Sequence, residues 1–474
     1  MQRVLHARRV AELVAGFDRD PAYRGLAEAL RALISDGRIP AGVRLPSERE
    51  LTEALAVSRT TITRAYAELR EHGYLTSRQG SGWSATLPTS GGHRGDLLLP
   101  AADLPEGSID LTCAAPLPAP GLLGAYQRAV EELPTHLAGT GYYPSGLPQL
   151  RAAIAERYAE RGLATDPAQI VVVPGALAGV AVAAQTLVGA GDRVLVESPS
   201  YPNAVAALAN RGGRLIGSDS DDWGGEGICA DLRRTRASTA YLVPDFHNPT
   251  GALRSDEERA RVAAVLRRHR TVAIIDESIV DLALDEIEMP RPFAVHTDDV
   301  ISIGSLSKSF WGGVRVGWLR VPRPMIDAVV QARVALDLGV PPLEQLVGVE
   351  LLRNGAELLA HRRDQLRQSR DAALEAVATH LPDWAPNAPL GGLNLWCRLP
   401  APLSTALVPR AAAHGVALAA GPSFAPEGGL NHYMRIPHAL PAHVMREAIE
   451  RLAVAWQETL AHPELSARTP TLVA

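Results

Sequence analysis

The chain has 474 residues, of which 46% are hydrophobic and 21% are charged. These ordinary values exclude a wholly disordered chain, a collagen and a coiled-coil rod, and the length suggests about three domains. The three cysteines are far apart, and neither a signal-like apolar core nor a membrane-length apolar run occurs. The sequence therefore predicts a cytoplasmic protein without a membrane segment.

Residues 22–86 are predicted to form three helices followed by a β-hairpin. The second helix begins with a capping box, in which Ser47 and Glu50 each bond the other's backbone. Ser58 is the expected N-cap of the third helix. The expected elements are helices at 22–34, 48–55 and 59–72 and a hairpin at 75–86 with its tip at 79–82.

The start of the third helix, at 58–61, carries polar side chains that suit a DNA groove. Arg49 is expected where the preceding helix would cross the phosphate backbone, and Gly80 at the hairpin tip allows a close backbone approach. Residues 1–84 have a charge balance of +3, whereas the rest of the chain has −8. This end therefore suits a polyanion, although a small bundle with an ordinary capped helix would show the same pattern.

Residues 22–84 resemble the winged helix-turn-helix of GntR-type bacterial regulators. The run GRIPAGVRLPSERELTEALAVSRTTITRAYAELREHGYLTSRQGSG carries this resemblance. It implies that residues 1–86 are a DNA-binding domain whose partner is a double-stranded operator. The DNA-contacting positions on this resemblance are Arg49, Ser58, Arg59, Thr60, Thr61 and Gly80, with Arg44 as a phosphate contact beside them.

Residues 87–108 are rich in Pro, Gly, Ser and Asp and are predicted to be a linker. From 109 onward short apolar runs alternate with helical stretches, which predicts a large, mostly parallel sheet covered on both faces at about 120–340. A smaller α+β part is predicted at about 341–460. The expected strands are 170–173, 194–197, 215–217, 240–243, 272–276, 300–303, 393–398, 416–420 and 433–436, and the main helices are 177–187, 256–269, 344–380 and 441–460.

Lys308 is the only lysine in the chain, because 46 of the 47 basic residues are arginine. Arginine replaces lysine well on surfaces, but its guanidinium stays protonated and cannot form a Schiff base. Lys308 directly follows the predicted strand at 300–303, between hydroxyl side chains and seven residues before Arg315. The pattern indicates a Schiff-base lysine beside a phosphate clamp of Ser305, Ser307 and Arg315.

Three further segments suit the same cofactor. Gly175 and Ala176 form a strand-to-helix turn whose free N–H groups suit a phosphate. Asp276 ends an apolar strand, where a carboxylate can keep a pyridinium nitrogen protonated. Asn248, in an Asn-Pro-Thr-Gly run after a strand, can donate to a phenolic oxygen. Taken singly, each segment also fits an ordinary turn or strand end.

Together these motifs resemble the fold-type I aminotransferases, which use pyridoxal 5'-phosphate, over about 110–460. The resemblance implies that Lys308 forms the Schiff base, Asp276 pairs with the ring nitrogen and Asn248 bonds the phenolic oxygen O3'. It also implies that Tyr201 stacks on the ring and Arg435 grips the α-carboxylate of an amino acid. The phosphate would be held by Gly175, Ala176, Ser305, Ser307 and Arg315, with Tyr142 or Tyr143 reaching the phosphate of the other subunit.

The sequence departs from that family at the tyrosine that bonds O3' shortly after the aspartate. Ser278 and Ile279 occupy those positions, and no tyrosine occurs between Tyr241 and Tyr433. This departure favours ligand sensing over efficient transamination.

A GntR-type head on such a body is similar to the MocR group of bacterial regulators. This resemblance predicts a homodimeric, DNA-binding protein that senses a small amine, an amino acid or pyridoxal 5'-phosphate itself. A working aminotransferase with an accessory DNA-binding module is the main alternative. A structural scaffold with an inactive cofactor site is the third.

Overall fold

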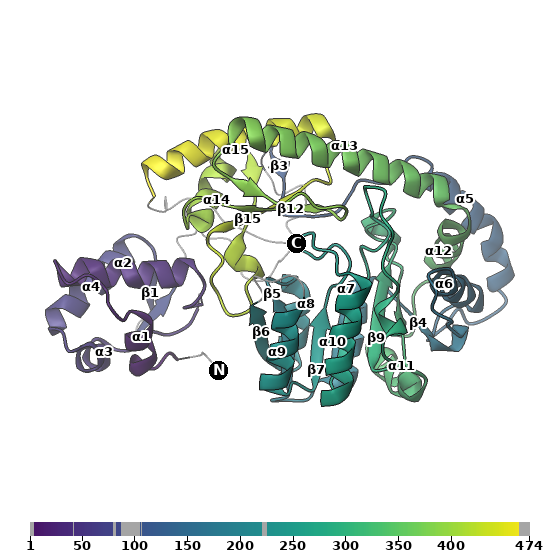
Figure 1. Cartoon of the computed structure of the whole chain (residues 1–474), viewed down its shortest axis with the longest axis horizontal. Helices are drawn as coiled ribbons and strands as arrows, with labels where there is room; N and C mark the ends of the chain where they lie inside the picture. The colour runs from purple at the N-terminus through teal and green to yellow at the C-terminus, as the bar shows by residue number, and fades with distance from the viewer. Residues whose placement is uncertain are drawn as a thin grey trace.

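The computed structural model describes residues 4–40, 42–78, 82–86, 105, 107–219 and 225–463. It comprises a small N-terminal head and a larger body, which has a sheet-containing large part and a smaller α+β part (Figure 1). No helix of these described ranges has the length and apolar character needed to cross a membrane.

The head is a winged helix-turn-helix, as the sequence predicts. The capping box at Ser47 forms, because its backbone N–H donates to Glu50 at 2.8 Å while the Glu50 N–H donates back to its hydroxyl. Ser58 caps the third predicted helix. A further helix precedes residue 22 and buries Val10 in the head core. The elements are α1 (Ala7–Leu13), α2 (Ala22–Ser35), α3 (Glu48–Leu55), α4 (Arg59–Glu71), β1 (Leu75–Arg78) and β2 (Gly82–Ala85).

The large part of the body contains a seven-stranded sheet in the order β4-β10-β9-β8-β7-β5-β6. The links from β9 to β6 are parallel, whereas β10 runs antiparallel to both of its neighbours. The predicted mostly parallel sheet is therefore confirmed, with one strand that the sequence pattern did not indicate. The strands are β4 (Ile170–Val173), β5 (Arg193–Ser198), β6 (Arg214–Asp219), β7 (Thr239–Leu242), β8 (Val272–Asp276), β9 (Val300–Ser305) and β10 (Gly317–Arg320).

Helices cover both faces of this sheet, and each face has its own apolar core. One core packs the sheet against α7, α8 and α11, and the other packs it against α6, α9, α10 and α12. The helices are α5 (Leu122–Glu132), α6 (Pro148–Glu160), α7 (Ala176–Leu187), α8 (Pro202–Asn210), α9 (Glu226–Thr235), α10 (Asp256–His269), α11 (Ile326–Val334) and α12 (Pro342–Asn354).

The small part packs three helices around a four-stranded sheet of order β11-β12-β15-β14. A separate two-stranded parallel pair joins β13 to β3, so the chain enters the body through the small part. The elements are β3 (Ile109–Asp110), α13 (Ala356–His380), β11 (Ala385–Pro386), β12 (Asn394–Arg398), α14 (Ser404–Ala413), β13 (Val416–Ala417), β14 (Ala419–Ala420), β15 (Tyr433–Pro437) and α15 (Ala442–Ala461).

Two predicted elements of this region are wrong in extent. The single helix predicted at 344–380 is two helices that meet at Gly355, because α12 packs into the core of the large part and α13 into that of the small part. The strand predicted at 416–420 is divided, and its halves β13 and β14 pair in different sheets. Most of the predicted linker, including 87–104, lies outside the described residues.

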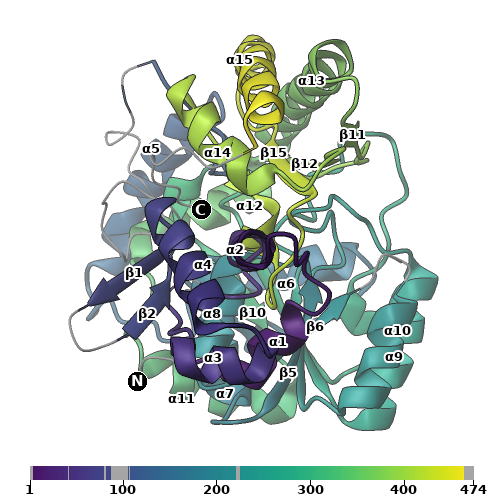
Figure 2. The same cartoon turned by 90° about the vertical axis from the view of Figure 1, so that its left-hand side faces the viewer.

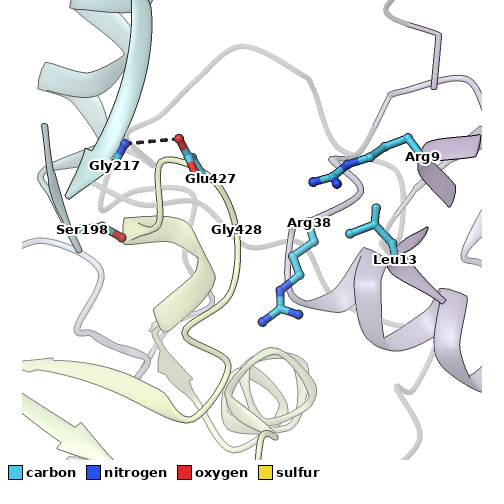
Figure 3. Close-up of a pocket in the computed structure, with 7 residues that line it drawn as sticks. All are labelled: Arg9, Leu13, Arg38, Ser198, Gly217, Glu427 and Gly428. Atoms are coloured by element: carbon cyan, nitrogen blue, oxygen red, sulfur yellow. Dashed lines mark hydrogen bonds between the residues drawn. The ribbon is translucent and has the colours of Figure 1, made fainter. Parts of the chain in front are cut away.

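The head contacts the body through the end of α2 and a loop of the small part, residues 421–432, called here the bridging loop (Figures 1 and 2). The Gly429 N–H donates to the Asp36 carbonyl at 2.5 Å, and the Thr405 hydroxyl donates to the Ser35 carbonyl at 2.9 Å. Beside this contact lies a cavity of about 360 Å³, lined by Arg9 and Arg38 of the head and by Glu427 of the bridging loop (Figure 3). The DNA-contacting residues predicted on α3 and α4 form no part of this contact.

Candidate functional site

A cavity of about 520 Å³ lies at the carboxyl ends of the parallel strands, where the small part covers the sheet. Ligands bind at this edge in open α/β sheets because the loops that follow the strands converge there. The volume is within the range of small-molecule and cofactor sites. Nine of the predicted cofactor and ligand residues line the cavity: Ala176, Tyr201, Asn248, Asp276, Ser305, Ser307, Lys308, Arg315 and Arg435.

Lys308 lies in the turn after β9 and extends into this cavity. Its Nζ donates to the Ala114 carbonyl at 2.8 Å. Burial lowers the pKa of the Lys308 ammonium below its ordinary value; Cys113 opposes this shift and the Arg435 cation adds to it. A larger share of neutral amine results, and the neutral amine is the form that attacks a carbonyl carbon.

Asp276 is the last residue of β8 and is buried at the floor of the cavity. Its Oδ1 accepts the Ser278 N–H at 2.9 Å, and its Oδ2 accepts the Tyr241 hydroxyl at 2.8 Å. Two donors thus fix the plane of the carboxylate. A carboxylate has about four lone-pair positions, so Asp276 can accept one further donor from a ligand in the cavity.

The predicted phosphate end is built around Ser307 and Arg315. The Ser307 N–H donates to the Ser305 hydroxyl at 3.1 Å, while Ser307 Oγ is buried without a hydrogen-bond partner among the described residues. Arg315 has a left-handed backbone with φ of 48° and donates to the Pro174 carbonyl at 2.6 Å. Gly175 has a φ of 96°, which favours glycine, and a Cβ there would lie 2.9 Å from Arg315 Nη2, so the guanidinium would have to move.

Arg435 on β15 and Asn248 after β7 approach the cavity from opposite sides. Arg435 is fully buried, with its Cζ 4.7 Å from the centre of the Phe424 ring. Burial lowers the pKa of Arg435 to about 10, a change that a bound anion would oppose. The Asn248 Oδ1 accepts from Asn394 at 3.3 Å and from Arg435 at 3.5 Å, so its Nδ2 is left to donate.

Of the three tyrosines predicted for the cofactor site, one lines the cavity and two do not. Tyr201 is the N-cap residue of α8 and lines the cavity, where its hydroxyl accepts from Asn203 at 3.0 Å. Tyr142 and Tyr143 are not among the residues that line it. Tyr142 is 63% exposed, and the Tyr143 hydroxyl instead meets His136 at 3.4 Å. Their predicted reach into another subunit stays a prediction.

Sequence analysis missed four polar residues of this cavity: Cys113, Asn203, Tyr241 and Asn394. Tyr241 occupies an apolar strand and was counted there as core, although its hydroxyl bonds Asp276. Asn394, at the start of β12, bonds Asn248, and Cys113 lies beside Lys308 and Arg435. The available signal was a tyrosine, seven residues before Asn248, inside an otherwise aliphatic run.

The described geometry fits pyridoxal 5'-phosphate. At one end, the Ser307 hydroxyl, unpartnered among the described residues, and the Arg315 guanidinium beside Gly175 suit a phosphate. At the other, the Asp276 carboxylate with spare lone pairs suits a pyridinium N–H, and the free Asn248 Nδ2 suits a phenolic oxygen. Lys308 lines the same cavity.

The predicted DNA-contacting residues gather at the start of α4 and its surroundings. Arg59 is 78% exposed on its side chain and lies 3.6 Å from Glu48, whereas the Ser58 hydroxyl is engaged as the N-cap of α4. Arg44 lies beside Gly82 at the base of the wing. The exposed members of the predicted set are Arg44, Arg49, Ser58, Arg59 and Thr60, with Thr61 half-buried; Gly80 lies outside the described residues.

Two family models match this chain. Residues 126–452 match the family described as aminotransferase class I and II, and residues 22–84 match the family described as bacterial regulatory proteins, gntR family. Together the two matches cover most of the body and the head from α2 onward.

The relatives of this chain include both a regulatory protein and an aminotransferase. The chain is 29% identical over 410 residues to the probable rhizopine catabolism regulatory protein MocR of Rhizobium meliloti, covering 77% of this chain and 80% of that one. It is 30% identical over 367 residues to the 2-aminoadipate transaminase of Thermus thermophilus, covering 74% and 91%.

Among solved structures, the chain is similar to LysN, an alpha-aminoadipate aminotransferase of Thermus thermophilus complexed with N-(5'-phosphopyridoxyl)-L-leucine. The TM-score is 0.68 at 27% identity, covering 75% of this chain and 94% of that one.

Proposed function

The chain belongs to the aminotransferase class I and II family and carries a DNA-binding gntR domain ahead of it, and from this premise we propose a transcription regulator that senses a small amine or amino acid through bound pyridoxal 5'-phosphate. The observation that carries the proposal is that the only lysine of the chain lines one cavity together with Asp276 and Arg435. The LysN complex, which holds a phosphopyridoxyl amino acid, supports the same chemistry.

Each side chain has a specific task in this proposal. Lys308 supplies the amine that holds the cofactor, and its lowered pKa keeps that amine reactive. Asp276 accepts from the ring nitrogen, while Ser307 and Arg315 bind the phosphate. When bound, the cofactor supplies an aldehyde that condenses with amines and a ring that withdraws electrons. Arg435 then binds an effector carboxylate through its planar, two-donor guanidinium edge.

The alternative function is an active aminotransferase with an accessory DNA-binding module. It is favoured by the relative that is named a 2-aminoadipate transaminase. It is disfavoured by Ser278 and Ile279, which stand where that family has the O3' tyrosine. Sustained turnover of an amino acid at about 1–10³ per second, the usual range for enzymes, would favour the enzyme over the sensor.

The proposed regulator acts as a homodimer. Exposed apolar side chains around α5 and before α12 support this, because monomers rarely leave such a group uncovered: Leu123, Val130, Leu137, Tyr142, Leu336 and Leu338. Two heads per particle would bind repeated half-sites on one face of the duplex, about 10 base pairs or a multiple apart.

The experiment that tests the proposed function is an absorbance titration of purified protein with amino acids and with matched amines that lack the carboxylate. In Arg435→Gln, we expect affinity for amino acids to fall about 10- to 100-fold, since hydrogen bonds to a charged group contribute about 1.5–3 kcal/mol. Binding of the matched amines should change little.

The matched amines also serve as the folding control for Arg435→Gln. A variant that still responds to them retains an intact cofactor site. Equal losses for both ligand series would contradict the assignment of Arg435, and a parent protein that shows no spectral response to any amine would contradict sensing.

Sensing requires a route from the cavity to the head, and the bridging loop supports one. At its start, the Phe424 ring lies against Arg435, and the Phe424 carbonyl accepts the Ser200 N–H at 2.8 Å, one residue before Tyr201. Further along, Glu427 accepts the Gly217 N–H at 3.2 Å, and Gly429 bonds the end of α2. A movement of Arg435 when an effector binds would thus be transmitted through the bridging loop to the end of α2 in the head.

Substituting Gly428 by alanine is expected to uncouple the head from the effector. A Cβ at Gly428 would lie 2.5 Å from the backbone nitrogen of Arg38, so the head must shift. Operator affinity should then respond less to effector, measured by fluorescence anisotropy with and without saturating amine, while the cofactor spectrum stays unchanged.

Gly429→Ala is the matched control for this uncoupling. Both glycines have positive φ, 82° and 97°, so both variants carry left-handed strain. The nearest head atom to a Cβ at Gly429 is a side-chain nitrogen of Arg38 at 4.0 Å. An undiminished effector response in Gly428→Ala, or an equal loss in both variants, would exclude this contact as the route.

A further inference from the structure

Tyr241 is the buried tyrosine of the cavity that the roles above leave unused. It lies on β7, where it pairs in parallel register with Ile274 of β8. Asp276 is two residues beyond Ile274 and so extends from the same face of the sheet, within diagonal reach of an aromatic side chain. The Tyr241 hydroxyl lies 2.8 Å from Asp276 Oδ2, and both residues are buried.

The proton of this hydrogen bond belongs to the tyrosine. Burial raises the pKa of Tyr241 well above its ordinary value, and the charge of Asp276 raises it further. The phenol therefore remains protonated and donates, which leaves Asp276 Oδ2 as the acceptor. Because its proton is directed to Asp276, Tyr241 does not supply the missing donor to the cofactor oxygen O3'.

Resting on the proposed function, we propose that Tyr241 is a positioning residue that holds the Asp276 carboxylate aimed at the pyridine nitrogen of the cofactor. Together with the Ser278 N–H on the other oxygen, it fixes the rotation of the carboxylate. Without the phenol, the carboxylate turns more freely and loses a donor of the kind that favours the charged form. The proton shared with the ring nitrogen then shifts toward the carboxylate, and the charged contact weakens.

The chain offers a matched control in Tyr158. This tyrosine is also buried, and its hydroxyl donates to Glu277, the residue directly after Asp276, at 3.1 Å. Tyr158 and Ile275 belong to the core on the opposite face of the sheet. Tyr158→Phe therefore removes a buried tyrosine–carboxylate hydrogen bond of the same kind, at a residue that does not line the cavity.

The test compares Tyr241→Phe, Tyr158→Phe and the parent as full chains loaded with pyridoxal 5'-phosphate labelled with ¹⁵N in the ring. In Tyr241→Phe, we expect the ¹⁵N resonance to move toward that of an unprotonated pyridine. The cofactor should also dissociate about 10- to 100-fold more readily, as measured by equilibrium dialysis. Tyr158→Phe should match the parent in both measurements, while both variants lose thermal stability.

The outcomes separate this proposal from the proposed function. A parent that takes up no cofactor overturns the proposed function and this proposal with it. A parent that binds the cofactor, with Tyr241→Phe giving the same resonance and the same dissociation, overturns only the role of Tyr241. An equal shift of the resonance in Tyr158→Phe also overturns it, because the effect would then be a general response to a weakened core.

Discussion

Replacing Lys308 by alanine is expected to abolish covalent retention of pyridoxal 5'-phosphate after borohydride reduction. Apart from the histidines, every other basic side chain is an arginine. Its guanidinium stays protonated and does not condense with an aldehyde. The parent should give a single lysyl adduct, located by mass spectrometry of the intact chain and of its peptides. The expected change is from a fully labelled chain to an unlabelled one.

The Lys308→Ala variant retains Ser307, Arg315 and Asp276, so it should still take up the cofactor without a covalent bond. Cofactor that co-elutes with the unreduced variant and is lost on denaturation would serve as the folding control. Covalently held cofactor in the reduced variant would contradict the assignment, because some other nucleophile would then hold it. So would a parent without an adduct.

Arg59→Ala is expected to weaken operator binding about 5- to 150-fold, which corresponds to about 1–3 kcal/mol for one base or phosphate contact. The side chain is highly exposed at the start of α4 and only loosely paired with Glu48. If Arg59 contacts a phosphate, the log–log slope of affinity against salt should become shallower by about 0.9. Fluorescence anisotropy over a salt series measures both quantities.

Arg70→Ala is the control for this DNA prediction. Arg70 lies in the last turn of the same helix and is exposed, so the variant removes an equal charge far from the expected groove contact. Equal losses in the two variants would indicate attraction by net charge alone. Unchanged affinity in Arg59→Ala, or binding that does not respond to salt, would contradict the proposed DNA surface. The cofactor spectrum should be the same in both variants.

Sequence patterns predicted those elements whose signals are local. The α10 helix is predicted at its observed residues, 256–269, and in the structure it begins at a capping box of Ser255 and Glu258. The β8 strand is predicted equally well because a short aliphatic run ends at a charged residue. The break at Gly355 was missed, since the helical pattern continues through it and only packing against two different cores separates α12 from α13.

The candidate site shows the same difference between local signals, which the sequence reveals, and contacts between distant residues, which it does not. Lys308, Asp276 and Arg315 are recognisable because each has an unusual side chain at a strand end or in a glycine-rich turn. Tyr241 was missed because its partner lies 35 residues away on the neighbouring strand, and a tyrosine in a buried strand is usually only core. The predicted reach of Tyr142 and Tyr143 concerns a second subunit, so a single chain leaves it a prediction.

The contact of the head with the bridging loop and the start of α14 consists of few polar links. Its strength depends on the head and the body being parts of one chain. Its principal polar links are the hydrogen bonds from Gly429 and Thr405 to the end of α2. As parts of one chain, the two surfaces meet at an effective concentration of about millimolar, roughly a thousandfold above that of separate molecules at micromolar concentration. A weak interface is thus occupied within the chain, and under the proposed route a change at Arg435 would alter that occupancy.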